Sequence, residues 1–183
     1  DYTLSDYANN TAMGTATVKA TGIGNFAGTK DLSFSIGATA IGEGDFAIAD
    51  KAFPGDAITL SDSDITSALA FGTDYTISSY SANTNAGTAS VTFDGAGNYA
   101  GTVTKNFTIT PADISAATIT INDQVYTGSQ IKPTSSQISA TFGGTYTLQE
   151  GTDYTITGYA NNMNVGVASV ALEGVGNFAH STR

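Results

Sequence analysis

Three copies of one stretch constrain the fold of this chain more than any other feature. The copies begin at Asp1, Asp74 and Asp153, align without a gap over about 29 residues, and start 73 and 79 residues apart. This spacing exceeds the roughly 20–50 residues of a solenoid repeat and suits small tandem domains with separate cores. The shared positions carry the same residue in every copy: Tyr7, Tyr80 and Tyr159; Asn10, Asn83 and Asn162; Gly14, Gly87 and Gly166; Ala16, Ala89 and Ala168; Val18, Val91 and Val170.

Inside each copy, apolar and polar residues alternate. Ala89, Val91 and Phe93 are separated by Ser90 and Thr92. Every second side chain of a strand lies on the same face, so this alternation predicts a strand with one buried face. Further short strands are expected around residues 75–77, 107–109 and 34–36.

Glycine and asparagine separate the expected strands, in runs such as 83–87 and 95–98. Both residues accept the positive φ that tight turns need. The recurring tyrosines and phenylalanines are predicted to be core residues rather than a ligand platform, because burying one such ring contributes roughly 1.5–3 kcal/mol. No amphipathic helix is evident; the best candidate, residues 61–69, is expected to make one turn from its capping-box pattern.

The repeat predicts where the domains begin and end. Residues 1–37 hold the C-terminal half of a repeat, 38–110 a complete repeat, and 111–183 a repeat that lacks its final strand. The third repeat is six residues longer, and the surplus falls near 141–150, where a loop or hairpin tip tolerates insertion. We expect the incomplete repeats to be completed by homotypic strand pairing with another copy or by a longer parent protein.

Charge and composition exclude several classes of partner. The net charge is −10 with only six Lys and Arg, which argues against nucleic acid and anionic lipid as partners. No apolar run approaches 18 residues, so no membrane insertion is expected. The chain has no cysteine. Its composition, rich in the Thr, Ser and Gly of strands and turns, is typical of extracellular bacterial proteins.

The repeated motif resembles a known family. The run Gly151-Thr152-Asp153-Tyr154-Thr155, followed by Gly174-x-Gly176-Asn177-Phe178, resembles the tandem bacterial immunoglobulin-like (Ig-like) repeats of large cell-surface and adhesin-type proteins. The resemblance implies tandem Ig-like β-sandwiches that act as a spacer, or stalk, on the bacterial surface, with neighbouring repeats as partners. Ala89 and Val91 replace the Tyr and Cys of the Ig corner pattern, so neither a tyrosine corner nor a core disulfide is expected.

No constellation of residues predicts catalysis. The single histidine, His180, lies near the C-terminus without an evident partner, and the Asp62/Asp64 and Glu43/Asp45 pairs fall in turn-like runs. We therefore expect no enzymatic activity and no obligatory cofactor. Calcium is the one metal that the sequence suggests, because hard oxygen ligands occur near the expected domain junctions. The candidate ligands are Glu43, Asp45, Asp50 and Asp113. The simpler interpretation is that these residues form solvated acidic loops.

Two other functions remain open at this point. A carbohydrate- or cell-wall-binding module needs exposed aromatic side chains, and four aromatics outside the repeat pattern are candidates: Phe46, Phe71, Phe142 and Tyr146. A third alternative is a fibre or decoration domain of a virion, which has the same sequence features as a spacer. The sequence identifies no ligand.

Overall fold

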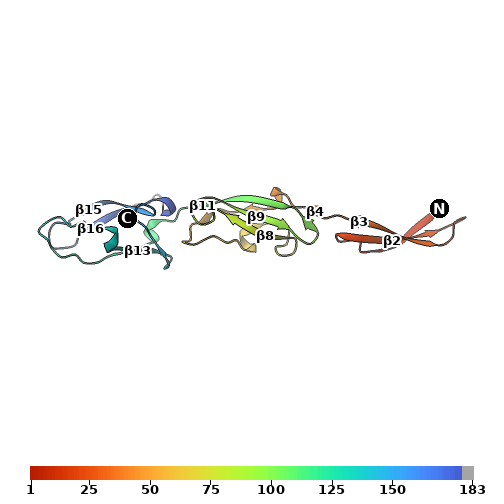
Figure 1. Cartoon of the computed structure of the whole chain (residues 1–183), viewed down its shortest axis with the longest axis horizontal. Helices are drawn as coiled ribbons and strands as arrows, with labels where there is room; N and C mark the ends of the chain where they lie inside the picture. The colour runs from red at the N-terminus through yellow and green to blue at the C-terminus, as the bar shows by residue number, and fades with distance from the viewer. Residues whose placement is uncertain (179–183) are drawn as a thin grey trace. The chain divides into compact units, whose positions relative to one another are not determined.

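The computed structural model describes residues 1–178, and the chain is all-β over this range (Figure 1). Its strands are β1 (Tyr2–Ala8), β2 (Gly14–Gly22), β3 (Thr29–Ile36), β4 (Thr39–Ala40), β5 (Ala47–Ile48), β6 (Lys51–Ala52), β7 (Ile65–Thr66), β8 (Tyr75–Ser81), β9 (Gly87–Gly95), β10 (Tyr99–Ala100), β11 (Thr102–Thr110), β12 (Thr118–Ile121), β13 (Ile138–Phe142), β14 (Tyr146–Thr147), β15 (Tyr154–Ala160) and β16 (Ser169–Gly174). Single turns of 3-10 helix are η1 (Glu43–Asp45), η2 (Asp62–Asp64), η3 (Ile114–Ala116), η4 (Ser135–Gln137) and η5 (Gly176–Phe178).

The strands recur with the sequence repeat. β8, β9 and β11 begin 73 residues after β1, β2 and β3, and β15 begins 79 residues after β8. The strands predicted around residues 34–36, 75–77, 89–93 and 107–109 are therefore confirmed. Hydrogen bonding orders the main sheets as β1-β2-β3, β6-β11-β9-β8, β12-β13-β14 and β15-β16, with smaller pairs β4-β10 and β5-β7.

Contacts divide the chain into two compact units. Unit 1 comprises Asp1–Ala47, Thr66–Ser79 and Val91–Lys105, and unit 2 comprises Ile48–Ile65, Tyr80–Ser90 and Asn106–Arg183. Strands β8, β9 and β11 contribute residues to both units. The boundaries expected after residues 37 and 110 describe the sequence repeat, and they stay a prediction.

The core of unit 1 forms around aromatic rings. Phe46 stacks on Phe93 with ring centroids 4.3 Å apart and meets Tyr75 edge to face at 4.9 Å. All three rings are buried, as is Val91. The alternation read from the sequence thus places Val91 and Phe93 on the covered face of β9, where the removal of apolar area from water stabilises the fold.

The N-terminal sheet β1-β2-β3 is antiparallel, with a register shift between Ser5 and Ala8 of β1, and much of its apolar surface is exposed. Tyr2 is 66% exposed and Tyr7 is 53% exposed, whereas Tyr75, the counterpart of Tyr2, is fully buried. The expectation that the recurring tyrosines and phenylalanines are core residues is therefore wrong for Tyr2 and Tyr7, and also for Phe26 and Phe34, which are 63% and 44% exposed. Within residues 1–178, Tyr2 and Tyr7 have no aromatic ring packed against them as Phe46 is packed against Tyr75.

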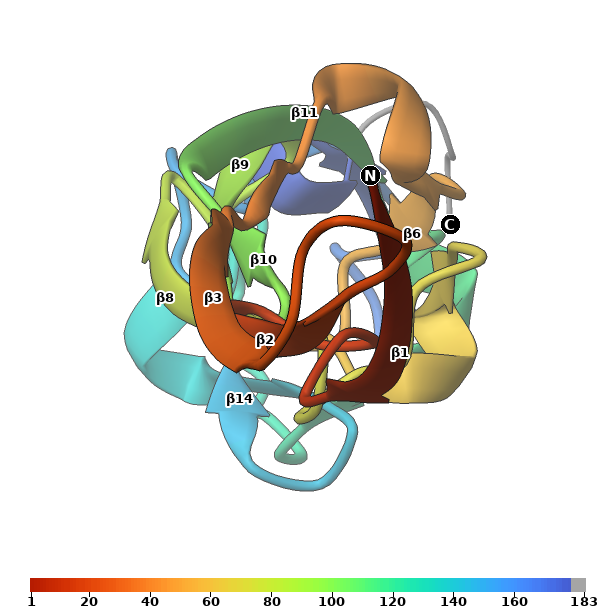
Figure 2. The ribbon, with the colours of Figure 1, turned by 90° about the vertical axis from the view of Figure 1, so that its right-hand side faces the viewer.

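The six surplus residues of the third repeat extend a hairpin in unit 2. β13 pairs antiparallel with β14, which is labelled in Figure 2, and Thr141 lies opposite Thr147 and Phe142 opposite Tyr146. The turn contains Gly143 and Gly144, both with positive φ, which glycine adopts without steric cost. The predicted position of the insertion is thus correct, and the hairpin brings Tyr146 into contact with Phe53 and Phe178.

The helical turn expected within residues 61–69 is present as η2. The Ser61 backbone N–H donates to Asp64 Oδ2 at 2.8 Å, which completes a capping box. The third repeat has the same device in η4, where the Thr134 backbone N–H donates to Gln137 Oε1. Within residues 1–178, no helix has the length and apolarity needed to cross a membrane.

Candidate functional site

The first candidate site is an asparagine that joins one repeat to the turn of the repeat before it. In unit 1, the backbone N–H of Met13 donates to Asn98 Oδ1 at 2.8 Å. The backbone N–H of Thr39, at the start of the following segment, donates to the main-chain oxygen of Asn98 at 2.9 Å. Asn98 therefore holds both the β1–β2 turn and the segment that leaves β3. We call this arrangement joint 1.

Unit 2 contains the same arrangement at the matching positions. The Ala86 backbone N–H donates to Asn177 Oδ1 at 2.7 Å, and the Ala112 backbone N–H donates to the main-chain oxygen of Asn177 at 2.8 Å. Asn177 Nδ2 also donates to Asn85 Oδ1 at 3.0 Å. We call this arrangement joint 2. Its recurrence at equivalent residues shows that the Gly-x-Gly-Asn motif has a defined structural role.

The glycine before each asparagine makes the joint geometrically feasible. Gly97 has φ +59° and Gly176 has φ +58°, in the left-handed region that favours glycine. A Cβ on Gly97 would lie 2.8 Å from the main-chain oxygen of Thr73, which is closer than carbon and oxygen can approach. The turn can therefore bring the asparagine to the joint only with glycine at this position.

An aromatic cluster surrounds joint 2. Phe178 is fully buried and lies 5.6 Å from Phe53, 5.2 Å from Phe142 and 5.9 Å from Tyr146, measured between ring centroids. Phe53 itself is 2% exposed. The phenylalanine of the third Gly-x-Gly-Asn-Phe motif thus packs on a side chain of the second repeat, which adds apolar burial to the hydrogen bonds of joint 2.

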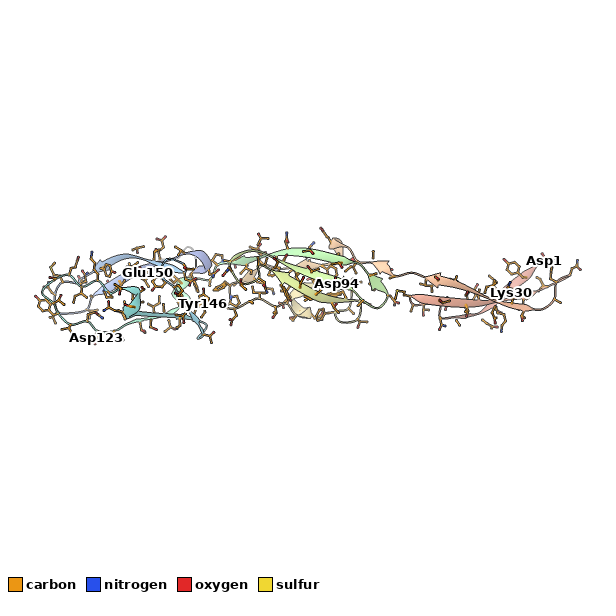
Figure 3. All side chains as sticks on the ribbon, in the orientation of Figure 1. Asp1, Lys30, Asp94, Asp123, Tyr146 and Glu150 are labelled. Atoms are coloured by element: carbon orange, nitrogen blue, oxygen red, sulfur yellow. The ribbon has the colours of Figure 1, made fainter. Side chains whose placement is uncertain are left out.

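Asp153 is a buried carboxylate beside this cluster. The hydroxyl of Tyr146, which is labelled in Figure 3, donates to Asp153 Oδ1 at 3.0 Å. The Gln149 backbone N–H donates to Asp153 Oδ2 at 2.9 Å. Burial, above all, raises the pKa of Tyr146, and the neighbouring carboxylate adds to the effect. Tyr146 therefore stays a neutral hydrogen-bond donor at ordinary pH, and its hydrogen bond to Asp153 has a structural role.

Other recurring polar residues hold their own repeat together. In the middle repeat, Asn83 exchanges two hydrogen bonds with the main chain of Ile58, and the Tyr80 hydroxyl accepts one from the Leu60 N–H. In the third repeat, Asn162 exchanges two with Ile131 in the same way. Tyr80, Asn83 and Asn162 therefore hold their own repeats together by hydrogen bonds that the predicted turns and core did not include.

The four calcium candidates lie in three separate segments of the chain. Glu43 and Asp45 lie in η1, where Asp45 Oδ2 accepts from the Gly42 N–H, and Asp113 Oδ1 accepts from the Ser115 N–H at the start of η3. Asp50 lies between β5 and β6. Among the residues that the structure describes, no three acidic, histidine or cysteine side chains converge as a metal site would require.

The aromatic candidates for a sugar site also separate. Phe46 belongs to the core of unit 1, whereas Phe142 and Tyr146 belong to the cluster around Phe178. Phe71, 40% exposed, meets Tyr75 edge to face and keeps an open surface. His180 lies outside the described residues. Three of the four candidates are thus occupied by packing within the chain.

The two joints were not predicted from the sequence. Their signal was available, because Asn98 and Asn177 recur in a Gly-x-Gly-Asn motif, but this motif was interpreted as turn chemistry alone. The partners Met13 and Ala86 could not be found from periodicity, since they lie 85 and 91 residues away. Comparisons of the chain with protein-family models, with curated proteins and with solved structures find no match.

Proposed function

We propose that this chain is a non-enzymatic structural spacer, built from tandem Ig-like β-sandwiches, in an extracellular bacterial surface protein of the adhesin type. The observation that carries the proposal is the recurrence of one joint, Asn98 in joint 1 and Asn177 in joint 2, at equivalent positions of successive repeats. A spacer requires the same connection between each pair of repeats. A binding module requires no such repetition.

The way the middle repeat packs supports a sandwich. The sheet β6-β11-β9-β8 has a buried face that includes Val91 and Phe93, and Phe46 covers it from the segment before η2. Two layers with apolar side chains between them are the defining feature of a β-sandwich. Placement outside a bacterial cell rests on the sequence resemblance and on the composition.

The function of joint 1 can be tested by removing its side-chain hydrogen bond. The chain has no cysteine, so Ser5→Cys and Ser79→Cys, both exposed positions of unit 1, allow specific fluorophore labelling. We expect Asn98→Ala to broaden the distribution of label-to-label distances in single-molecule energy transfer, because the Met13 N–H loses its acceptor in the protein. This hydrogen bond is exposed, so its loss should cost about 0.5–1.5 kcal/mol.

The matched control is Asn25→Ala. Asn25 is the equivalent residue of the first Gly-x-Gly-Asn motif, and its side chain is exposed, so the distribution should not change. A parent chain with a distribution as broad as that of Asn98→Ala would contradict the spacer proposal. A glycan-array signal that disappears in Phe71→Ala would instead support the carbohydrate-binding alternative.

A further inference from the structure

The surplus residues of the third repeat form a structure that the second repeat has no residues to build. Residues 142–147 have no counterpart there, because only residues 66–68 separate Ile65 from Leu69. In the third repeat the surplus supplies the end of β13, the turn and β14, and it includes two aromatic rings. The difference lies inside the second repeat itself.

Both rings of the hairpin contact one side chain of the second repeat. The Phe142 ring stacks on the Phe53 ring with centroids 6.4 Å apart, and the Tyr146 ring meets Phe53 edge to face at 5.3 Å. Phe53 follows β6 in the chain and is 2% exposed. The hairpin of the third repeat thus helps to enclose a side chain of the repeat before it, and the apolar burial stabilises this contact.

The main chains of the two repeats also approach each other at the hairpin. A Cβ on Gly55 would lie 3.1 Å from Tyr146 Cβ, and a Cβ on Gly143 would lie 3.6 Å from the main-chain oxygen of Pro54. All four residues belong to unit 2. Since backbone as well as side chains meet here, rotation of one side chain does not separate the two repeats.

The hairpin also holds the segment that carries Asn177. Phe178, the next residue, packs on both hairpin rings and on Phe53. Asn177 Oδ1 accepts from the Ala86 N–H in joint 2. Withdrawal of Asn177 from Ala86 therefore disturbs the ring cluster as well as the hydrogen bonds.

We propose that the β13–β14 hairpin is a brace that keeps joint 2 closed, so that the parts of the second and third repeats within unit 2 move as one rigid body. Joint 1 has the same asparagine hydrogen bonds but no such hairpin, because the second repeat lacks the residues for it. The brace deepens the spacer proposal and rests on it for its purpose. Its test reads joint 2 alone.

The test measures hydrogen exchange of the Ala86 amide, whose bond to Asn177 reports the opening of joint 2. In the full chain, Phe142→Ala/Tyr146→Ala should make this amide exchange about tenfold faster or more, because joint 2 then opens without disrupting the ring cluster. The Ile58 amide, which donates to the Asn83 oxygen within the second repeat, should keep its rate within about twofold.

Two further variants separate bracing from a general loss of stability. Tyr159→Ala removes a half-buried ring of the third repeat outside the hairpin, whose hydroxyl donates to the Pro133 oxygen. It should leave exchange at Ala86 unchanged. Deletion of residues 142–147 gives the third repeat the length of the second, and it should accelerate exchange at Ala86 as the double variant does.

Single-molecule energy transfer measures the same motion directly. Ser81→Cys and Thr157→Cys place labels at exposed positions of the second and third repeats, both in unit 2. The parent chain should give a narrow distribution of label-to-label distances, and Phe142→Ala/Tyr146→Ala a broader one.

Three results would overturn the proposal: unchanged exchange at Ala86 in the brace variants, equal acceleration in Tyr159→Ala, or a distance distribution as broad in the parent chain as in the double variant. If the double variant does not fold, Phe142→Ala and Tyr146→Ala are measured singly against the same outcomes. The spacer proposal is tested through Asn98 at joint 1, so its failure is distinguishable from failure of the brace.

Discussion

At the scale of residues, one pair of positions shows how the repeats keep a contact while changing its chemistry. In the middle repeat the Lys51 ammonium donates to Asp64 Oδ1. In the third repeat Gln124 and Gln137 occupy these positions, and Gln137 Nε2 donates to Gln124 Oε1 at 2.7 Å. Both pairs connect the segment before the capping turn to the last residue of that turn.

The charged pair predicts a dependence of stability on pH. Hydrogen bonds from Lys51 and then from Ser61 lower the pKa of Asp64 from 3.8 to about 2. Because the folded pKa is depressed, the stabilisation is complete above the unfolded value and is lost as pH falls from about 4 to about 2. The Asp64 side chain is 26% exposed, so the contribution is at most about 1 kcal/mol.

The double variant Lys51→Gln/Asp64→Gln copies the amide pair of the third repeat and provides the comparison. Urea unfolding from about pH 5 to about pH 2 should give a smaller loss of unfolding free energy for the variant than for the parent chain, since other carboxylates titrate equally in both. Parallel pH profiles would show that the ion pair contributes nothing.

At the scale of elements, a glycine controls how β9 passes into β10. The Gly95 N–H donates to the Gly101 oxygen at 2.9 Å, and a Cβ on Gly95 would lie 2.7 Å from the Ala100 nitrogen. The closest obstacle is main chain, which cannot rotate away as a side chain can. The tight passage therefore excludes every residue with a Cβ unless the two segments separate.

We predict that Gly95→Ala destabilises the fold by about 1–3 kcal/mol, as overpacking does. Thermal and denaturant unfolding measure the effect. Gly44→Ala is the control, because a Cβ there meets no atom within 4 Å, and it should change the unfolding free energy by less than about 0.5 kcal/mol. Equal effects in both variants would mean that the passage is looser than the structure indicates.

At the scale of the whole molecule, sequence copies of the same strands differ in how well they are covered. Tyr75 of β8 is buried against Phe46, whereas the residues of β1, the copy of β8 in the first repeat, are exposed along its length. β2 and β9 share the alanine and valine of the repeat, and both pairs, Ala16/Val18 and Ala89/Val91, are buried, but only β9 lies beside the aromatic core of Phe46, Tyr75 and Phe93. Coverage, rather than local sequence, is therefore expected to set the local stability.

Native-state hydrogen exchange tests this expectation. The amide of Val18 should exchange at least about tenfold faster than the amide of Val91, because β1-β2-β3 opens without disrupting an aromatic core. Val18 and Val91 have the same side chain, so their intrinsic exchange rates are similar. Equal protection of the two amides would contradict the prediction.

Local periodicity was sufficient to predict the longer strands of the repeated motif, its turns and the position of the insertion, but not short strands such as β5 and β6. Strand alternation and glycine turns depend on neighbouring residues, so β9 and the capping turn at Ser61 could be read directly. The joints were missed because a hydrogen bond such as Ala86 to Asn177 connects residues that are distant in the sequence.

The amino-acid sequence by itself determined that this chain is built from strands in three related copies, because period-two alternation and turn residues act locally. Only the tertiary structure decided which copies of a residue are buried: Tyr75 but not Tyr2, and Ala89 but not Ala168. The physical reason is that burial requires a second surface. That surface comes from segments such as Phe46 and β11, which the repeated motif itself does not contain.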